Sequence, residues 1–140
     1  MFKLIKIENG RQNVPEPDYL DVTENEAVAI GEALVLANGK LTKCPETTVP
    51  KYIAMGEVSK ASEKRTVAVC RIESNHLYEV PVSDAPSVLK IGDKVTLYAG
   101  DAESGEIGAD RVTATTEGGV AEIVALNGAA VAGDKITVRF

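Results

Sequence analysis

Few side chains in this 140-residue sequence are of the types that carry out catalysis. His76 is the single histidine, and a nucleophilic site needs a base beside the nucleophile and a third group that orients the base. Nothing near His76 supplies that arrangement, and the Gly-x-Ser-x-Gly elbow and the glycine patterns that bind phosphates are absent. We therefore interpret His76 as an exposed turn residue and expect the protein not to be an enzyme.

The residues that could bind a metal ion are equally sparse. Cys44 and Cys70, with one histidine, do not supply the four ligands of a structural zinc site. Nothing in the sequence establishes that their Cα atoms lie within bridging distance. We therefore predict two reduced thiols, with Cys70 buried. The acidic segment 101–110 matches a calcium loop at its first and third positions, but glycine stands fifth, glutamate sixth and Val112 twelfth. We predict a solvated loop there, and neither a metal ion nor a cofactor.

Composition narrows the class of protein and its partners. The chain is 44% hydrophobic and 26% charged, which is typical of one globular domain with one core. Its net charge of −6 offers no attraction to phosphate backbones or anionic membranes, so we expect neither nucleic acid nor membrane as a partner. Residues 1–7 lack the apolar run of a secretory signal, and residues 27–37 are too short to span a bilayer.

Short β-branched runs, separated by glycine, asparagine and aspartate, dominate the sequence from residue 33 onward. This pattern predicts an all-β fold, a small β-barrel or β-clip-like domain with short hairpins. We expect strands at residues 66–72, 77–82, 95–98 and 136–140. In the last of these, isoleucine, valine and phenylalanine alternate with polar residues, which indicates a core strand and not a loose tail.

Turn residues indicate where these strands are connected. Asn38-Gly39 favours a type I′ hairpin between residues 33–37 and 40–42, and Gly118-Gly119 predicts a second hairpin between residues 112–116 and 120–126. Residues 24–37 also fit helical spacing, but Gly31 interrupts a helix there, so we favour a strand. Residues 84–89 predict at most one short helical turn.

A weak repeat occurs at residues 30–36, 91–97 and 132–138. Each copy has an apolar residue, a glycine, an acidic residue, any residue, and then alternating apolar residues. Glycine permits a left-handed turn, and we expect the acid to remain solvated where the strand begins. The repeat is either a duplication or the set of turns that any compact β-domain requires.

The N-terminal residues differ in character from the rest. We predict an extended arm over residues 1–22, followed by a single β-domain over residues 23–140, with order beginning near residue 20. Residues 8–20 contain two prolines, little apolar content and no periodicity. A solvated tail has no need of the apolar pair Tyr19-Leu20, so we interpret the arm as a docking element that could add a strand to a neighbouring sheet.

The order of these signals resembles the head decoration (capsid cement) proteins of tailed bacteriophages. In that family an N-terminal arm precedes a "Gly-x-x-Leu-x-Leu, turn, Lys-Leu" hairpin, which here matches residues 31–42. A "Gly-Ile-Ala" type strand follows in the family, whereas here Gly56 comes after the apolar residues 53–55. The C-terminal residues 133–140 resemble the ends of such proteins as well.

The resemblance implies a structural virion protein on the capsid exterior, made in the host bacterial cytoplasm. It implies a homo-oligomer, with a trimer favoured, whose arms contact the major capsid protein and stabilise the shell. The contact candidates on the arm are Pro15, Pro17, Tyr19 and Leu20. Alternatives are a tail or tube component, or a generic β-barrel binding module. A trimeric dUTPase-like nucleotide hydrolase is less favoured, because this chain ends in a plain strand and not in a glycine-rich arm.

Overall fold

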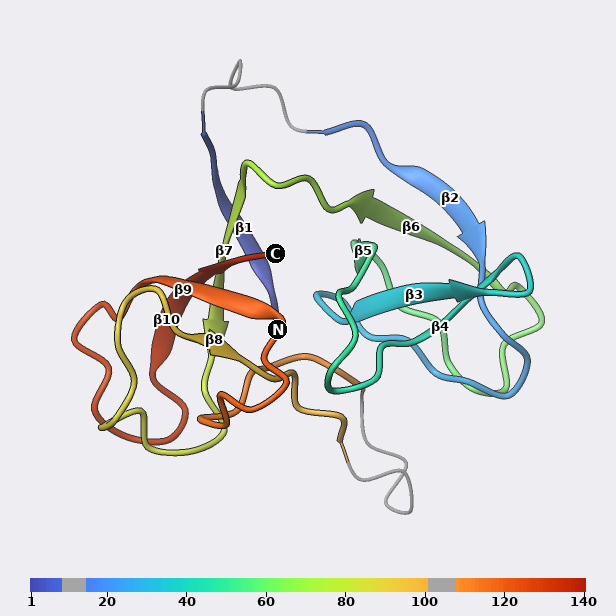
Figure 1. Ribbon diagram of the computed structural model, residues 1–140. Helices are drawn as coiled ribbons and strands as arrows, with labels where there is room; N and C mark the ends of the chain where they lie inside the picture. The colour runs from blue at the N-terminus through green and yellow to red at the C-terminus, as the bar shows by residue number, and fades with distance from the viewer. Residues whose placement is uncertain (9–14, 101–107) are drawn as a thin grey trace.

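The fold consists of two antiparallel β-sheets. The computed structural model describes residues 1–8, 15–100 and 108–140, and within them it contains ten strands and no helix, which confirms the all-β class. The first sheet has the order β1 (Lys3–Ile7), β7 (His76–Pro81), β10 (Lys135–Arg139), β9 (Ala121–Ala125) and β8 (Lys94–Val95). The second has the order β2 (Asp18–Asp21), β6 (Thr66–Arg71), β5 (Tyr52–Ala54), β3 (Ala33–Ala37) and β4 (Lys40–Lys43). Figure 1 shows the two sheets in opposite halves of the molecule.

Within the described residues, the sheets are not closed into a barrel by continuous ladders. An isolated parallel bridge between Val22 and Leu41 joins the two edges of the second sheet at one point. In the first sheet, Val112 forms bridges to both Val82 and Leu97. It thereby links the segment that follows β7 to the segment that follows β8. At these points the bridges occupy backbone groups that would otherwise be open to pairing with the strand of another chain.

Local turn signals account for much of the strand layout. β3 and β4 form the predicted hairpin, with Ala37 paired to Lys40, and Asn38 and Gly39 both have positive φ. This confirms the strand interpretation of residues 33–37. The predicted hairpin at Gly118-Gly119 is wrong, because β9 pairs with β8 and β10 and not with residues 112–116. Gly118 has a positive φ as a turn requires, so the sequence signal was correct for the turn but not for the strand pairing.

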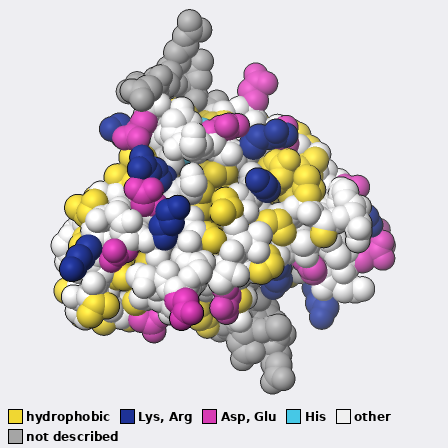
Figure 2. Space-filling model, in the orientation of Figure 1, with side chains coloured by type: hydrophobic (Ala, Val, Ile, Leu, Met, Phe, Trp, Pro, Cys, Tyr) yellow, Lys and Arg dark blue, Asp and Glu magenta, His cyan; other side chains and the backbone are white. Residues whose placement is uncertain are grey.

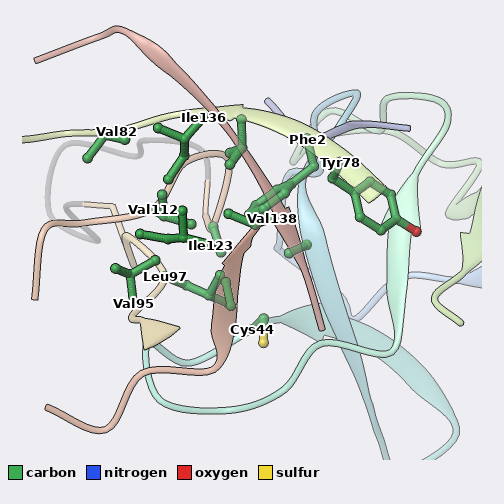
Figure 3. Packing of buried hydrophobic residues seen from close by; sticks show 14 of the residues in the cluster. Phe2, Cys44, Tyr78, Val82, Val95, Leu97, Val112, Ile123, Ile136 and Val138 are labelled. Atoms are coloured by element: carbon green, nitrogen blue, oxygen red, sulfur yellow. The ribbon is translucent and has the colours of Figure 1, made fainter. Parts of the chain in front are cut away.

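Two clusters of buried hydrophobic residues hold the sheets together. The larger cluster lies against the first sheet and includes valine and isoleucine from β7, β9 and β10 together with loop residues such as Leu97 and Val112. Figure 3 shows these side chains pointing toward one another, with the Phe2 and Tyr78 rings at one side. The smaller cluster lies against the second sheet and includes Leu34 and Leu41. Removal of this apolar surface from water is the main favourable term for folding.

The N-terminal segment differs from the predicted arm. β1 pairs with β7 through Lys3 and Glu79, and β2 pairs with β6 through Asp18 and Val69, so the segment contributes one strand to each sheet. Phe2 is buried in the larger cluster. Residues 3–7 and 18–21 of the predicted arm are therefore strands, and β1 begins well before residue 20. The partners are far away in the sequence, and local composition therefore contains no sign of them.

Candidate interaction surfaces

The three glycine-acid turns share one hydrogen-bonding arrangement. In each, the acidic side chain accepts a backbone N–H from the residue three positions earlier: Ala29 to Glu32 at 2.9 Å, Lys90 to Asp93 at 2.8 Å, and Val131 to Asp134 at 3.0 Å. Gly31, Gly92 and Gly133 have φ values of 76°, 92° and 90°, as the sequence predicts. The repeated acid therefore ties the turn together from within.

Glu32 departs from the expectation of a solvated acid, because it is completely buried. Its turn lies where the sheets meet, with Phe2 N–H donating to the Gly31 carbonyl and Gly31 N–H donating to Ala54. Its second carboxylate oxygen accepts the Gly108 N–H at 3.0 Å. Burial raises the pKa of Glu32, while the two N–H donors and nearby Lys43 act in the opposite direction. The donors replace water around the carboxylate, so the Glu32 side chain joins its own turn to the segment at Gly108.

The other two glycine-acid turns lie in surface loops at one end of the first sheet. We call residues 84–94 and 127–135 the loop tip. Backbone hydrogen bonds from Val82 to Asp134 and from Ile123 to Asp93 bring both loops to the same end of the sheet, and Figure 1 shows them there at the lower left. Among its hydrophobic side chains, Val88 is 74% exposed, Ile91 68% and Val131 60%.

The loop tip is firmly attached even though those three side chains face solvent. Leu89 is buried in the larger cluster, its N–H donates to the Pro86 carbonyl, and Ala129 packs against the same cluster. Separate residues therefore anchor the loops, and Val88, Ile91 and Val131 add little to the core. Sequence reasoning missed this surface, although Ile91, the aliphatic residue just before Gly92, was an available signal.

The predicted contact residues of the arm do not share one environment. Tyr19 is 71% exposed on β2, a strand at the margin of the second sheet, and Pro17 is exposed just before it. Leu20 packs instead against the smaller hydrophobic cluster. Pro15 is half-buried and lines a groove between the sheets. The structure thus brings Pro17 and Tyr19 to the surface, while Leu20 and Pro15 have structural neighbours.

That groove has a volume of about 370 Å³ and is mostly apolar. Its rim includes Met1 and Ile30, which are 54% and 51% exposed, and its wall includes Cys70 and Tyr78. Figure 2 shows hydrophobic atoms in the middle of this face of the molecule, where the two sheets meet. The groove is a second apolar surface, but it presents few polar groups that would orient a ligand.

His76 is buried at 4% exposure on β7, which corrects the expectation of an exposed turn residue. The Glu73 N–H donates to His76 Nδ1 at 3.4 Å, and the Tyr78 hydroxyl lies 3.2 Å from the same nitrogen. Burial lowers the pKa of His76 and raises that of Tyr78. The arrangement favours a neutral imidazole, because burial disfavours its charged form, and Nδ1 then accepts from the buried polar groups around it.

Both cysteines are buried and free, so the prediction for Cys70 is confirmed. Burial raises the pKa of Cys44 to about 12 and also raises that of Cys70, which keeps both thiols protonated. Residues 101–107 of the acidic segment lie outside the described residues. Asp110, which is described, pairs with Arg111 at 2.8 Å and with the N-terminal ammonium at 3.8 Å.

The part of the chain that the structure describes contains neither a metal-binding cluster nor a long apolar helix. There, no three histidine, cysteine, aspartate or glutamate side chains lie close enough together to hold a metal ion. Over the same residues, no helix has the length and apolar character needed to cross a membrane.

Comparisons with known proteins concern the fold. The chain has an all-β fold of two five-stranded sheets. It is similar to the N base of the head fiber protein gp8.5 of bacteriophage phi29, with a TM-score of 0.53 and 17% sequence identity. The likeness covers 89% of this chain and 93% of that one. No protein-family model matches the chain, and no curated protein matches it in sequence.

Proposed function

We propose that this protein is a structural component of a bacteriophage head, which attaches to the outside of the capsid and stabilises it. The observation that carries the proposal is the likeness of fold to a head fiber base over 89% of this chain and 93% of the other. The proposed partner is the major capsid protein. The proposed location is the capsid exterior, after synthesis in the host bacterial cytoplasm.

The proposed mechanism is mechanical and includes no chemical reaction. A homo-oligomer, with a trimer favoured, would contact several capsid subunits at once, so that modest single contacts add up through multivalency. Tyr19 and Pro17 are the proposed capsid contacts, because both are exposed and a large aromatic side chain can supply a disproportionate share of binding energy. The net charge of −6 would keep unattached copies soluble.

Co-sedimentation with empty shells tests this proposal. The shells are assembled from the major capsid protein encoded in the same phage or prophage genome. We expect saturable binding of the wild-type protein, and for Tyr19→Ala an affinity lower by about tenfold or more, as for a central aromatic contact. Val49→Ala is the matched control, because Val49 is 45% exposed in a loop of the same half of the molecule.

Two outcomes would overturn the proposal. One is the absence of wild-type binding to shells at concentrations that saturate other capsid-binding proteins. The other is binding to purified tails or tubes but not to shells, which would favour the alternative of a tail component. Equal loss of binding in Tyr19→Ala and Val49→Ala would contradict Tyr19 as the contact while leaving capsid attachment in place.

A further inference from the structure

We infer that the loop tip, residues 84–94 and 127–135, is the surface through which copies of this chain contact one another. The inference rests on the homo-oligomer in the proposed function, and it does not depend on capsid attachment. It adds a specific surface and specific residues, which neither the fold likeness nor the sequence provides.

Three aliphatic side chains of the loop tip are exposed although the loops do not need them for their attachment. Among the large aliphatic side chains of the described residues, Val88, Ile91 and Val131 alone have 60% or more of their surface exposed. Removing such a side chain from water is favourable, so its exposure leaves free energy available to a partner that covers it. The loops do not need these side chains, because Leu89 and Ala129 already anchor them to the larger cluster.

Hydrogen bonds within each loop fix the backbone that carries these side chains. The Asp134 carboxylate accepts N–H groups from Ala130 and Val131 at 2.8 and 3.0 Å, and the Asp93 carboxylate accepts the Lys90 N–H. These bonds hold Val131 and Ile91 in place before any partner arrives. A surface ordered in advance loses less conformational entropy on binding, which increases affinity.

The charge of the loop tip favours a second copy of this chain as its partner. The whole chain has a net charge of −6, but the loop tip carries three acidic residues and three lysines: Asp84, Asp93, Asp134, Lys90, Lys94 and Lys135. Two acidic molecules repel each other least through a surface that is itself neutral. Figure 2 shows hydrophobic side chains mixed with charges of both signs at the lower left, over these loops.

Within this neutral surface, Lys90 and Asp84 remain available to a neighbour, whereas the charge of exposed Lys94 acts on nearby Glu122. Lys135 pairs with Glu79, and the Asp93 and Asp134 carboxylates accept N–H groups of their own loops. Lys90 is exposed and has no ion pair among the described residues, and exposed Asp84 accepts only the Ser83 hydroxyl there. In a symmetric assembly each copy presents both signs, so Lys90 of one copy pairs with Asp84 of the next.

Sedimentation velocity of the full chain over a range of concentrations tests the inference. We expect a concentration-dependent oligomer for the wild-type protein, and for Ile91→Asp and Val131→Asp a dissociation constant higher by at least about tenfold each. Val49→Asp is the matched control, because it also introduces a charge at an exposed valine but lies outside the loop tip. Circular dichroism checks that each variant remains folded.

A charge exchange gives an independent measurement. Lys90→Asp and Asp84→Lys each weaken association, and the double variant restores it, because the pair is rebuilt with opposite polarity. A strictly monomeric wild-type protein would overturn the inference, as would an oligomer unaffected by Ile91→Asp and Val131→Asp or weakened equally by Val49→Asp. Shell binding is measured separately, so a monomer that still binds shells would contradict only the loop tip, and an oligomer that ignores shells would contradict only the capsid function.

Discussion

The two halves of the molecule are stabilised in different ways. The larger cluster contains 16 buried hydrophobic residues, most of them from the first half but also Ala33 and Ile53 of the second sheet, whereas the cluster against the second sheet contains nine. The second half compensates with polar contacts: the Arg65 guanidinium donates to the carbonyls of Thr23, Glu26, Ser59 and Lys60, and Glu26 accepts from Thr42 and Lys43. The first half has a larger apolar core and also exposes aliphatic residues at its loop tip. The first half is therefore stabilised mainly by apolar burial, whereas the second half depends more on specific hydrogen bonds.

Phe2 tests how much the larger core contributes to stability. Phe2 is 3% exposed, and its ring contacts those of Tyr78 and Phe140 at centroid distances of 6.4 and 5.6 Å. We expect Phe2→Ala to lower the free energy of unfolding by about 3 to 5 kcal/mol, because it leaves a cavity and removes an aromatic cluster. Urea denaturation measures this change.

Tyr19→Ala is the control for that experiment, because Tyr19 belongs to the same N-terminal segment but is 71% exposed. We expect it to change the free energy of unfolding by less than about 0.5 kcal/mol, as is usual for surface substitutions. If Phe2→Ala were equally mild, residues 1–22 would act as an arm after all, and the larger core would have to be complete without them.

Arg65 tests the polar half. We expect Arg65→Ala to destabilise the protein by about 2 to 3 kcal/mol, because four backbone carbonyls lose a charged donor. Arg65→Lys should recover little, since an ammonium cannot reproduce the forked geometry of a guanidinium. The control is Arg71→Ala, whose 3.8 Å ion pair with Asp18 is solvent-exposed and should contribute less than about 1 kcal/mol. Equal effects at Arg65 and Arg71 would contradict the proposed dependence on hydrogen bonds.

What could be predicted from the sequence was local. Asn38-Gly39 defined a hairpin because its residue types specify the backbone conformation of the turn, and the turn glycines 31, 92 and 133 were recognisable for the same reason. β1 could not be recognised, because its partner β7 lies far along the chain and pairing depends on the whole fold. The same limit explains the misassigned partner of β9.

Burial was the second quantity that the sequence did not provide. Glu32 and Asp134 occupy the same position in one repeat, yet Glu32 is fully buried and Asp134 is half-buried. The difference arises because the first turn lies between the sheets and the third lies at the loop tip. His76 was misjudged for a related reason: its neighbours along the chain are polar, but its neighbours in space include Tyr78. The surface at Val88, Ile91 and Val131 likewise required the three-dimensional structure.

The repeated turns allow a smaller, matched test of burial. Glu32→Ala leaves the N–H groups of Ala29 and Gly108 without their acceptor in a buried place, so we expect a loss of about 2 kcal/mol. Asp134→Ala removes the equivalent acceptor in a solvated loop, where water replaces it, and should cost about 1 kcal/mol or less. Thermal unfolding of both variants under one condition compares them. A larger loss for Asp134→Ala would contradict the structural role assigned to the buried turn.

His76 should give the free energy of unfolding a small dependence on pH. Its pKa is lowered in the folded protein, mainly by burial, so the unfolded chain binds a proton more readily. Stability from this residue is therefore fully present above the unfolded pKa of about 6.5 and declines as the pH falls below it. Glu32 acts in the opposite direction, because its raised pKa adds relative stability as the pH falls toward its unfolded value.

His76→Gln keeps a side-chain acceptor near Glu73 and Tyr78 but does not titrate. We expect the difference in unfolding free energy between wild type and this variant to shrink by about 1 kcal/mol or less between pH 7.5 and 5.5. A difference that stays constant or grows over this interval would mean that the folded protein accommodates a charged imidazole, and that burial at β7 does not control the protonation of His76.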